Sequence, residues 1–291
     1  MLNLGLLCDI DGPIASPVTR SIAIPSIAQD LVRLAGAGVP VAFITGRSDE
    51  FVRQQVIPPL QGAGLADALT RSPGRMFAVF EKGAVWATVE PSGLSEITVD
   101  SSVALPAEVG EEIRNLVHGR FSDTMFFDET KRAMISVEQR TDVESEVYQE
   151  AQARFDDLAF EVLVGHGLGV RHGSRVHADA DGAVPFRIDP TIISTDIESV
   201  LLDKDRAAER TLAYFAESGE LPRRWRSIGD SRSDYRMADH LHEAGFDVAH
   251  VDVRPSDGVL EKPYPVIVIE GKIHDEAGAE FLANWVAELG L

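Results

Sequence analysis

The chain has 291 residues, enough for about two domains of ordinary size. Hydrophobic residues make up 44% and charged residues 25% of a sequence without a repeat, which excludes a disordered or fibrous chain. The 27 basic and 47 acidic residues leave a net charge of −20, and such a surface repels nucleic-acid phosphates and anionic lipids. We therefore expect neither nucleic-acid nor membrane partners, and an anionic substrate would need a local cationic site.

The single cysteine, Cys8, excludes an intrachain disulfide and favours a reducing, cytoplasmic setting. The apolar residues before Asp9 have no basic leader, and they form too short a run for a signal sequence or a membrane span. We expect them to form a buried strand.

Strand and helix patterns alternate over the first 90 residues. Apolar runs predict strands at residues 4–10, 39–44 and 76–80, each ending at glycine or polar residues. Helical spacing predicts a helix at 26–37 and a second at 49–60, interrupted by two prolines. This order is typical of a doubly wound, mainly parallel, Rossmann-like α/β sheet.

The pattern changes from about residue 88, where apolar and polar positions alternate as in hairpins. The expected helices lie at 107–118 and 142–155, and the expected strands at 134–138, 159–164, 168–172 and 175–177. These elements predict an antiparallel sheet with helices on one face.

The α/β pattern returns near residue 195. The expected elements are helices at 205–217 and 235–244, and strands at 225–228, 246–251 and 265–269. We therefore predict an α/β core, residues 1–90 and 195–291, interrupted by an inserted α+β cap at 91–194. The active site is expected in the crevice between them.

Acidic residues follow two of the expected core strands, where open α/β sheets bind their ligands. Asp9 and Asp11 precede Gly12, which permits the bend that brings both carboxylates to one site. Asp230 and Asp234 stand four residues apart, a spacing that suits a hard divalent cation. Taken alone, the first pair could be a solvated turn and the second a helix cap.

Hydroxyl and cationic groups occur at two further points. Thr45, Gly46 and Arg47 end the second strand and can hold phosphate oxygens, although an ordinary strand-to-helix turn is the alternative. Lys204 stands between two acids before a helix, a position usually occupied by a solvated surface charge.

The order of these four segments resembles the four motifs of the haloacid dehalogenase (HAD) superfamily of phosphotransferases. The turn Glu81-Lys82-Gly83-Ala84 is similar to the Glu-Asn-Gly-Ala turn of the branch that carries the larger α/β cap. That branch includes sucrose-phosphate, trehalose-phosphate and mannosyl-3-phosphoglycerate phosphatases, Cof-type phosphatases and phosphomannomutase. The resemblance covers nearly the whole chain.

The resemblance implies a catalytic role for three of these residues. Asp9 would be the nucleophile that forms an aspartyl-phosphate. Asp11 would protonate the leaving alkoxide and then deprotonate the attacking water. Lys204 would neutralise charge on the nucleophile and on the phosphoryl group.

The resemblance also implies the binding groups. Mg²⁺ would be held by the Asp9 carboxylate, the Asp11 backbone carbonyl and Asp230, with Asp234 in or just behind the coordination sphere. Thr45, Gly46 and Arg47 would hold the phosphate. The expected substrate is a phosphorylated sugar or a related small metabolite; the oligomeric state is left open.

Two residues depart from the family pattern. Pro13 stands where a threonine is usual, and Ser233 where an asparagine is usual. Neither departure removes a carboxylate, so we expect effects on substrate and efficiency rather than on the type of reaction.

Substrate choice is expected to depend on the cap, where four cationic or imidazole side chains lie in one short segment, with Lys82 as a further candidate. The four are Arg171, His172, Arg175 and His177. Surface residues of a hairpin are the alternative. Three rival functions remain at this point: a phosphohexomutase, a phosphate-responsive receiver module, and a HAD protein that binds its ligand without turnover.

Overall fold

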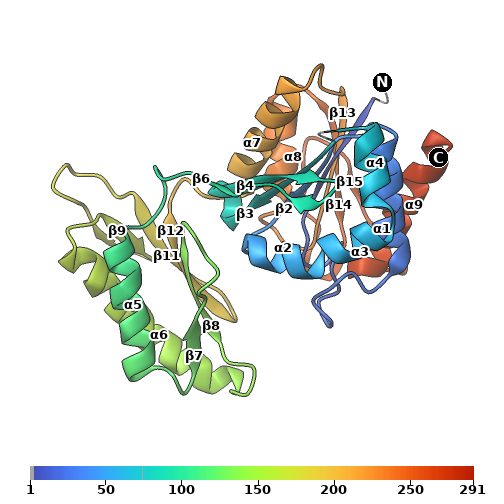
Figure 1. The fold of residues 1–291 in the computed structure, drawn as a ribbon. Helices are drawn as coiled ribbons and strands as arrows, with labels where there is room; N and C mark the ends of the chain where they lie inside the picture. Colours follow the sequence, from blue (N-terminus) through green and yellow to red (C-terminus); the bar gives the residue numbers. More distant parts are fainter. Residues whose placement is uncertain (1–2, 74) are drawn as a thin grey trace. The chain divides into compact units, whose positions relative to one another are not determined.

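The computed structural model describes residues 3–73 and 75–291, which form two units (Figure 1). The core unit runs to Thr98 and resumes at Asp203, and the cap unit is Val99–Leu202. The predicted boundaries at 90 and 194 therefore need correction. Residues 195–199 belong to the cap because they pair with two cap strands, and residues 91–98 belong to the core.

The core sheet has the predicted doubly wound topology. Its parallel strands lie in the order β15-β14-β13-β1-β2-β3, so β2 and β3 extend the sheet on one side of β1, and β13, β14 and β15 extend it on the other. These strands are β1 (Leu4–Cys8), β2 (Val41–Ile44), β3 (Met76–Phe80), β13 (Arg224–Gly229), β14 (Asp247–Asp252) and β15 (Val266–Ile267). The reversal at β1 is a topological switch point, where ligands bind in open α/β sheets.

Three strands that were not predicted extend the sheet beyond β3. They are β4 (Val85–Glu90), β5 (Gly93–Leu94) and β6 (Thr98–Val99). β4 pairs antiparallel with β3 and with β5, and β6 pairs with β4. The sheet is therefore mixed at this edge.

Helices cover both faces of the core sheet (Figure 1). On one face lie α7 (Lys204–Glu217) and α8 (Tyr235–Glu243); on the other lie α1 (Pro25–Gly36), α3 (Ile57–Gly62), α4 (Leu65–Arg71) and α9 (His274–Leu289). The first layer packs around Trp225, which is fully buried. Gly5 on β1 makes room for that ring, since a Cβ there would lie 2.5 Å from it.

Most predicted core elements are present, with shifted ends. The helix expected at 49–60 is two helices, α2 (Asp49–Gln55) and α3, because the two prolines occupy the first turn of α3, where proline is tolerated. Two helices, α4 and α9, were not predicted. Short 3-10 turns, η1 (Glu81–Gly83) and η2 (Pro255–Asp257), complete the unit.

The cap unit is a sheet with two helices packed on one face. The strand order is β10-β9-β11-β12-β8-β7, with β7 (Met125–Phe127), β8 (Ile135–Gln139), β9 (Val170–His172), β10 (Arg175–His177), β11 (Phe186–Pro190) and β12 (Ser194–Ser199). The sheet is not wholly antiparallel, because β9 and β11 pair in parallel. The helices α5 (Ala107–Arg120) and α6 (Ser145–Gly165) share one buried cluster with the sheet.

The strand predicted at 159–164 is wrong, because these residues form the end of α6. Their buried side chains, Ala159, Phe160 and Leu163, continue the helical series begun by Tyr148 and Phe155. A short apolar run fits a strand or a buried helix equally well by pattern, and here the helix is favoured by burial against the sheet.

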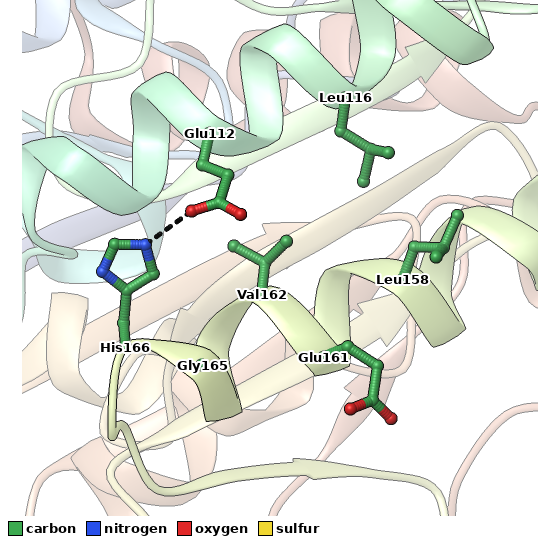
Figure 2. Close-up of a pocket in the computed structure, with 7 residues that line it drawn as sticks. All are labelled: Glu112, Leu116, Leu158, Glu161, Val162, Gly165 and His166. Atoms are coloured by element: carbon green, nitrogen blue, oxygen red, sulfur yellow. Dashed lines mark hydrogen bonds and ion pairs between the residues drawn. The ribbon is translucent and has the colours of Figure 1, made fainter.

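A pocket lies between α5 and α6, lined by Leu116, Leu158 and Val162 together with charged residues (Figure 2), and its volume is about 500 Å³. His166 Nε2 and Glu112 Oε2 close one side of it at 2.8 Å. None of the predicted site residues lines this pocket. Among the described residues, no helix combines the length and apolar character needed to cross a membrane.

Candidate active site

The predicted core motifs meet at the carboxyl edge of the parallel strands. Asp9 follows β1, Thr45 follows β2 and Asp230 follows β13, while Lys204 is the first residue of α7. These strands are adjacent in the sheet, so residues far apart in sequence are brought to one place.

Lys204 is the centre of this arrangement. Its Nζ lies 2.6 Å from Asp9 Oδ1 and 2.7 Å from Asp234 Oδ1, and it donates a hydrogen bond of 3.1 Å to the carbonyl of Ile44. Lys204 is only 6% exposed, so it is not a solvated surface charge. Burial alone would lower the pKa of Lys204, but the two carboxylates raise it, and the ammonium stays charged.

Three carboxylates gather around this single ammonium. Ligand oxygens of Asp9, Asp230 and Asp234 all lie within 4.8 Å of one another. Burial, together with the charge of Asp234, raises the pKa of Asp9 well above its ordinary value. The same two causes raise the pKa of Asp230 to about 6.

The charge balance of this cluster fits a hard divalent cation. Three carboxylates face the one buried ammonium of Lys204, and the partly exposed Arg254 approaches only Asp230, at 3.9 Å, so this all-oxygen site keeps a surplus of negative charge. A dication such as Mg²⁺ would offset this surplus and favour the ionised carboxylates.

Asp234 is held firmly in place. Its Oδ2 accepts hydrogen bonds from the backbone N–H groups of Asp230 (3.1 Å) and Ser231 (2.9 Å) and from the Ser231 hydroxyl (2.8 Å). Although burial opposes the charge, Lys204 and these hydrogen bonds keep the pKa of Asp234 below its ordinary value. Ser233, the second departure from the family pattern, contacts the Ser231 hydroxyl at 2.8 Å.

Asp11 lies at the edge of the cluster, with 39% of its side chain exposed, and forms a bidentate pair with Arg47. Arg47 Nη2 donates to Asp11 Oδ1 at 3.1 Å and Nε donates to Oδ2 at 3.2 Å. The guanidinium also lies over the ring of Phe51. In this structure Arg47 is therefore the partner of Asp11, and its contact with a phosphate stays a prediction.

The loop after β1 fits tightly against its neighbours. Gly12 has a φ of +98°, and a Cβ there would lie 2.8 Å from the Asp230 carboxylate. The carbonyl oxygen of Pro13, the first departure from the family pattern, would lie 1.9 Å from a Cβ on Gly278 of α9. Both glycines permit a close approach that any larger residue would block.

The Thr45 loop is joined to the turn after β3. The Thr45 hydroxyl accepts from the Arg47 N–H (3.0 Å), and its carbonyl accepts from the Lys82 N–H (3.2 Å). Lys82 has a φ of +54°, and its side chain passes beside Gly46. A Cβ added to Gly46 would lie 3.8 Å from Lys82 Cε. Lys82 therefore lies beside the Thr45 loop in the core, and its role in substrate choice stays a prediction.

The cap candidates divide between the two faces of their sheet. Residues 170 and 172 of β9 point to the side of α5 and α6, as do their cross-strand partners in β10, His177 and Arg175. His172 Nε2 accordingly lies 3.7 Å from Asp156 of α6. Arg175 stacks on Phe160 of α6 at 3.9 Å from the ring centroid.

Only Arg171 of the four cap candidates points to the opposite face. It is exposed there beside its neighbour in the register, Arg187 of β11. Arg187 donates to the buried Glu198 at 2.7 Å. The four residues close together in sequence are thus not one group in the cap.

Two residues near the core cluster were missed. His274 Nδ1 lies 3.8 Å from Asp230 Oδ2, and Arg254 Nη1 lies 3.9 Å from the same oxygen. Arg254 follows the end of β14, a position from which it could have been found. His274 begins α9, and nothing in its sequence context connects it to Asp230.

No protein-family model and no curated protein matches this chain in sequence. Among solved structures, the C-terminal domain of trehalose-6-phosphate phosphatase from C. albicans aligns with a TM-score of 0.64 at 11% identity, covering 98% of this chain and 93% of that one.

Two further structures align over nearly the whole chain. A haloacid dehalogenase-like hydrolase from Bacteroides thetaiotaomicron gives a TM-score of 0.56 at 11% identity, covering 97% of this chain and 98% of that one. IMP-nucleotidase from Plasmodium falciparum gives 0.54 at 11% identity, covering 96% and 61%. The chain therefore has the fold of the haloacid dehalogenase-like hydrolases, with an inserted cap.

Proposed function

We propose that this protein is a Mg²⁺-dependent phosphatase that hydrolyses the phosphoric monoester of a sugar or a related small metabolite. The observation that carries the proposal is the position of Lys204, whose Nζ touches both Asp9 and Asp234 in a cluster that also contains Asp230. This arrangement joins a nucleophile, a fixed positive charge and a set of oxygen ligands at one strand edge.

The proposed reaction has two displacements at phosphorus. An Asp9 carboxylate oxygen forms a bond to phosphorus while the bond to the leaving alcohol breaks, and Asp11 gives that alcohol its proton. Asp11 then takes a proton from water as the water oxygen displaces Asp9, which releases inorganic phosphate. The partial exposure of Asp11 suits this role, since both alcohol and water must reach it.

The chain's own groups hold the reactants in place. Lys204 restrains the Asp9 carboxylate and offsets charge on the phosphoryl oxygens, while the Thr45 hydroxyl and the Gly46 N–H would bind those oxygens. Asp9, Asp230 and Asp234, with the Asp11 carbonyl, would hold Mg²⁺. When bound, that ion supplies positive charge against the oxygens that become more negative during transfer.

The side chains on one face of the cap sheet favour a polar substrate. The sheet face opposite α5 and α6 carries Arg171, Arg187 and the hydrogen-bonded pair Ser136 and Asp196, which join at 2.8 Å. Hydroxyl groups of a sugar can pair with such donors and acceptors. One structural neighbour is named a trehalose-6-phosphate phosphatase, which agrees with a sugar phosphate, but another is named a nucleotidase.

A panel of phosphorylated compounds tests this proposal. The protein is incubated with Mg²⁺ and hexose phosphates, disaccharide phosphates or nucleoside monophosphates, and inorganic phosphate is measured. Release from a sugar phosphate is expected, and preferred release from a nucleotide would overturn the substrate class. Formation of an isomeric sugar phosphate without release would instead indicate a mutase. Neither product from any compound, although substrate binds, would indicate a protein without turnover.

A further inference from the structure

We propose that His274 is a positioning residue for the metal ligand Asp230. The inference rests on the proposed function, because that function makes Asp230 a ligand of Mg²⁺. His274 is the first residue of α9, in a part of the sequence far from the four motifs that define the site.

The backbone at His274 adopts a conformation that few side chains favour. Its φ is +49°, and its N–H donates a 2.8 Å hydrogen bond to the carbonyl of Val253, just beyond β14. A non-glycine residue in this region is strained and persists only where its surroundings hold it. Here the conformation starts α9 and turns the imidazole toward Asp230.

The imidazole is buried on the side that faces the acidic cluster. His274 Nδ1 has no hydrogen-bond partner among the described residues, although it is shielded from solvent. Asp230 Oδ2 lies 3.8 Å from this nitrogen. This separation is about 1 Å longer than a hydrogen bond, so a small movement of either side chain would complete one.

Two basic side chains approach the same oxygen of Asp230. Arg254 Nη1 lies 3.9 Å from Oδ2, and the Gly12 backbone packs against that side of the carboxylate. The other oxygen, Oδ1, has no hydrogen bond or ion pair with any residue that the structure describes. The asymmetry suits a carboxylate that is steadied through one oxygen and offers the other to an ion.

Groups that hydrogen-bond to ligating side chains commonly change metal affinity by about 10- to 100-fold when they are removed. His274 can act in this way with an Nδ1–H directed at Oδ2. Arg254 alone cannot replace it, because its guanidinium is more exposed and is also paired with Asp257. The expected consequence is weaker Mg²⁺ binding without His274, even in the absence of substrate.

Calorimetric titration of the full-length protein with Mg²⁺, without substrate, tests the inference. His274→Gly removes the imidazole and suits the positive φ, so strain is relieved rather than added. His274→Asn keeps a donor and also tolerates this φ. We expect about tenfold weaker Mg²⁺ binding for the glycine variant and affinity within about threefold of wild type for the asparagine variant.

A matched control and a fourth variant separate the possible outcomes. His118→Asn, at an exposed position of α5, should bind Mg²⁺ as the wild type does. If His274→Gly retains wild-type affinity while Asp230→Asn loses it, the positioning role is wrong and the proposed metal site stands. If Asp230→Asn also retains wild-type affinity, the metal site of the proposed function is wrong. Denaturant unfolding without metal checks that each variant is folded.

Discussion

The core and the cap use their charged residues in opposite ways. In the core, carboxylates and the Lys204 ammonium are buried together at the strand edge, where they leave uncompensated charge. In the cap, Arg175 lies on Phe160 and pairs with Asp157 and Glu161, so its charge is compensated within the fold. The neighbours of Lys204 thus leave a charge that a bound ion could offset, whereas the neighbours of Arg175 cancel its charge and fix it to the fold.

The largest effect is expected from replacing Asp9, the proposed nucleophile. Asp9→Asn should lower phosphate release by at least about 10³-fold, because an amide cannot form the aspartyl-phosphate. Steady-state kinetics on the best substrate of the panel measure this loss. The exposed Asp67→Asn on α4 is the control and should leave the rate unchanged. Undiminished turnover by Asp9→Asn would show that another group attacks phosphorus.

The core also contains a buried histidine outside the site. Burial lowers the pKa of His250 from 6.5 to about 4, and its Nδ1 contacts the Ser227 hydroxyl at 2.8 Å. A lowered folded-state pKa means that the neutral form is favoured by folding. This contribution to stability is complete above pH 6.5 and is lost as the pH falls toward 4.

Because of His250, the free energy of unfolding should be about 3 kcal/mol lower at pH 4 than at pH 7. Urea unfolding at several pH values measures it, and His250→Asn should remove this part of the pH dependence. Since other groups titrate over the same range, the relevant quantity is the difference between wild type and variant. A difference that does not change with pH would contradict the lowered pKa.

Arg171 lies on the face of the cap sheet opposite α5 and α6, and its replacement tests whether this face binds the substrate. Arg171→Ala should raise KM about tenfold, because it removes a cation from the face proposed to meet the substrate. Its unfolding free energy should change little, since the side chain is exposed. Kinetics and urea unfolding on the same preparation measure both quantities. An unchanged KM would remove Arg171 from substrate recognition.

On the face that packs against α5 and α6, we expect a substitution to change stability and not KM. Arg175→Ala should lower the free energy of unfolding by about 0.5–1 kcal/mol, through lost stacking on Phe160 and a largely solvent-screened ion pair. Its KM should stay at the wild-type value. If Arg175→Ala instead raised KM with no loss of stability, the assignment of the two faces would be reversed.

The core could be predicted well because its motifs are tied to strand ends. Apolar runs identify β1, β2 and β13, and polar residues that follow parallel strands must meet at one edge. The cap was harder to predict. The end of α6 was mistaken for a strand, and a short apolar run does not by itself determine which element it forms.

The sequence by itself thus determined the α/β class, the inserted cap and the segments whose acids and lysine form the cluster, since each depends on local pattern and order. Tertiary structure decided which atoms meet. It placed Arg47 on Asp11, turned His172 and Arg175 toward α6, and brought His274 to Asp230. These contacts depend on sheet register, on face and on the start of a distant helix, which no local pattern encodes.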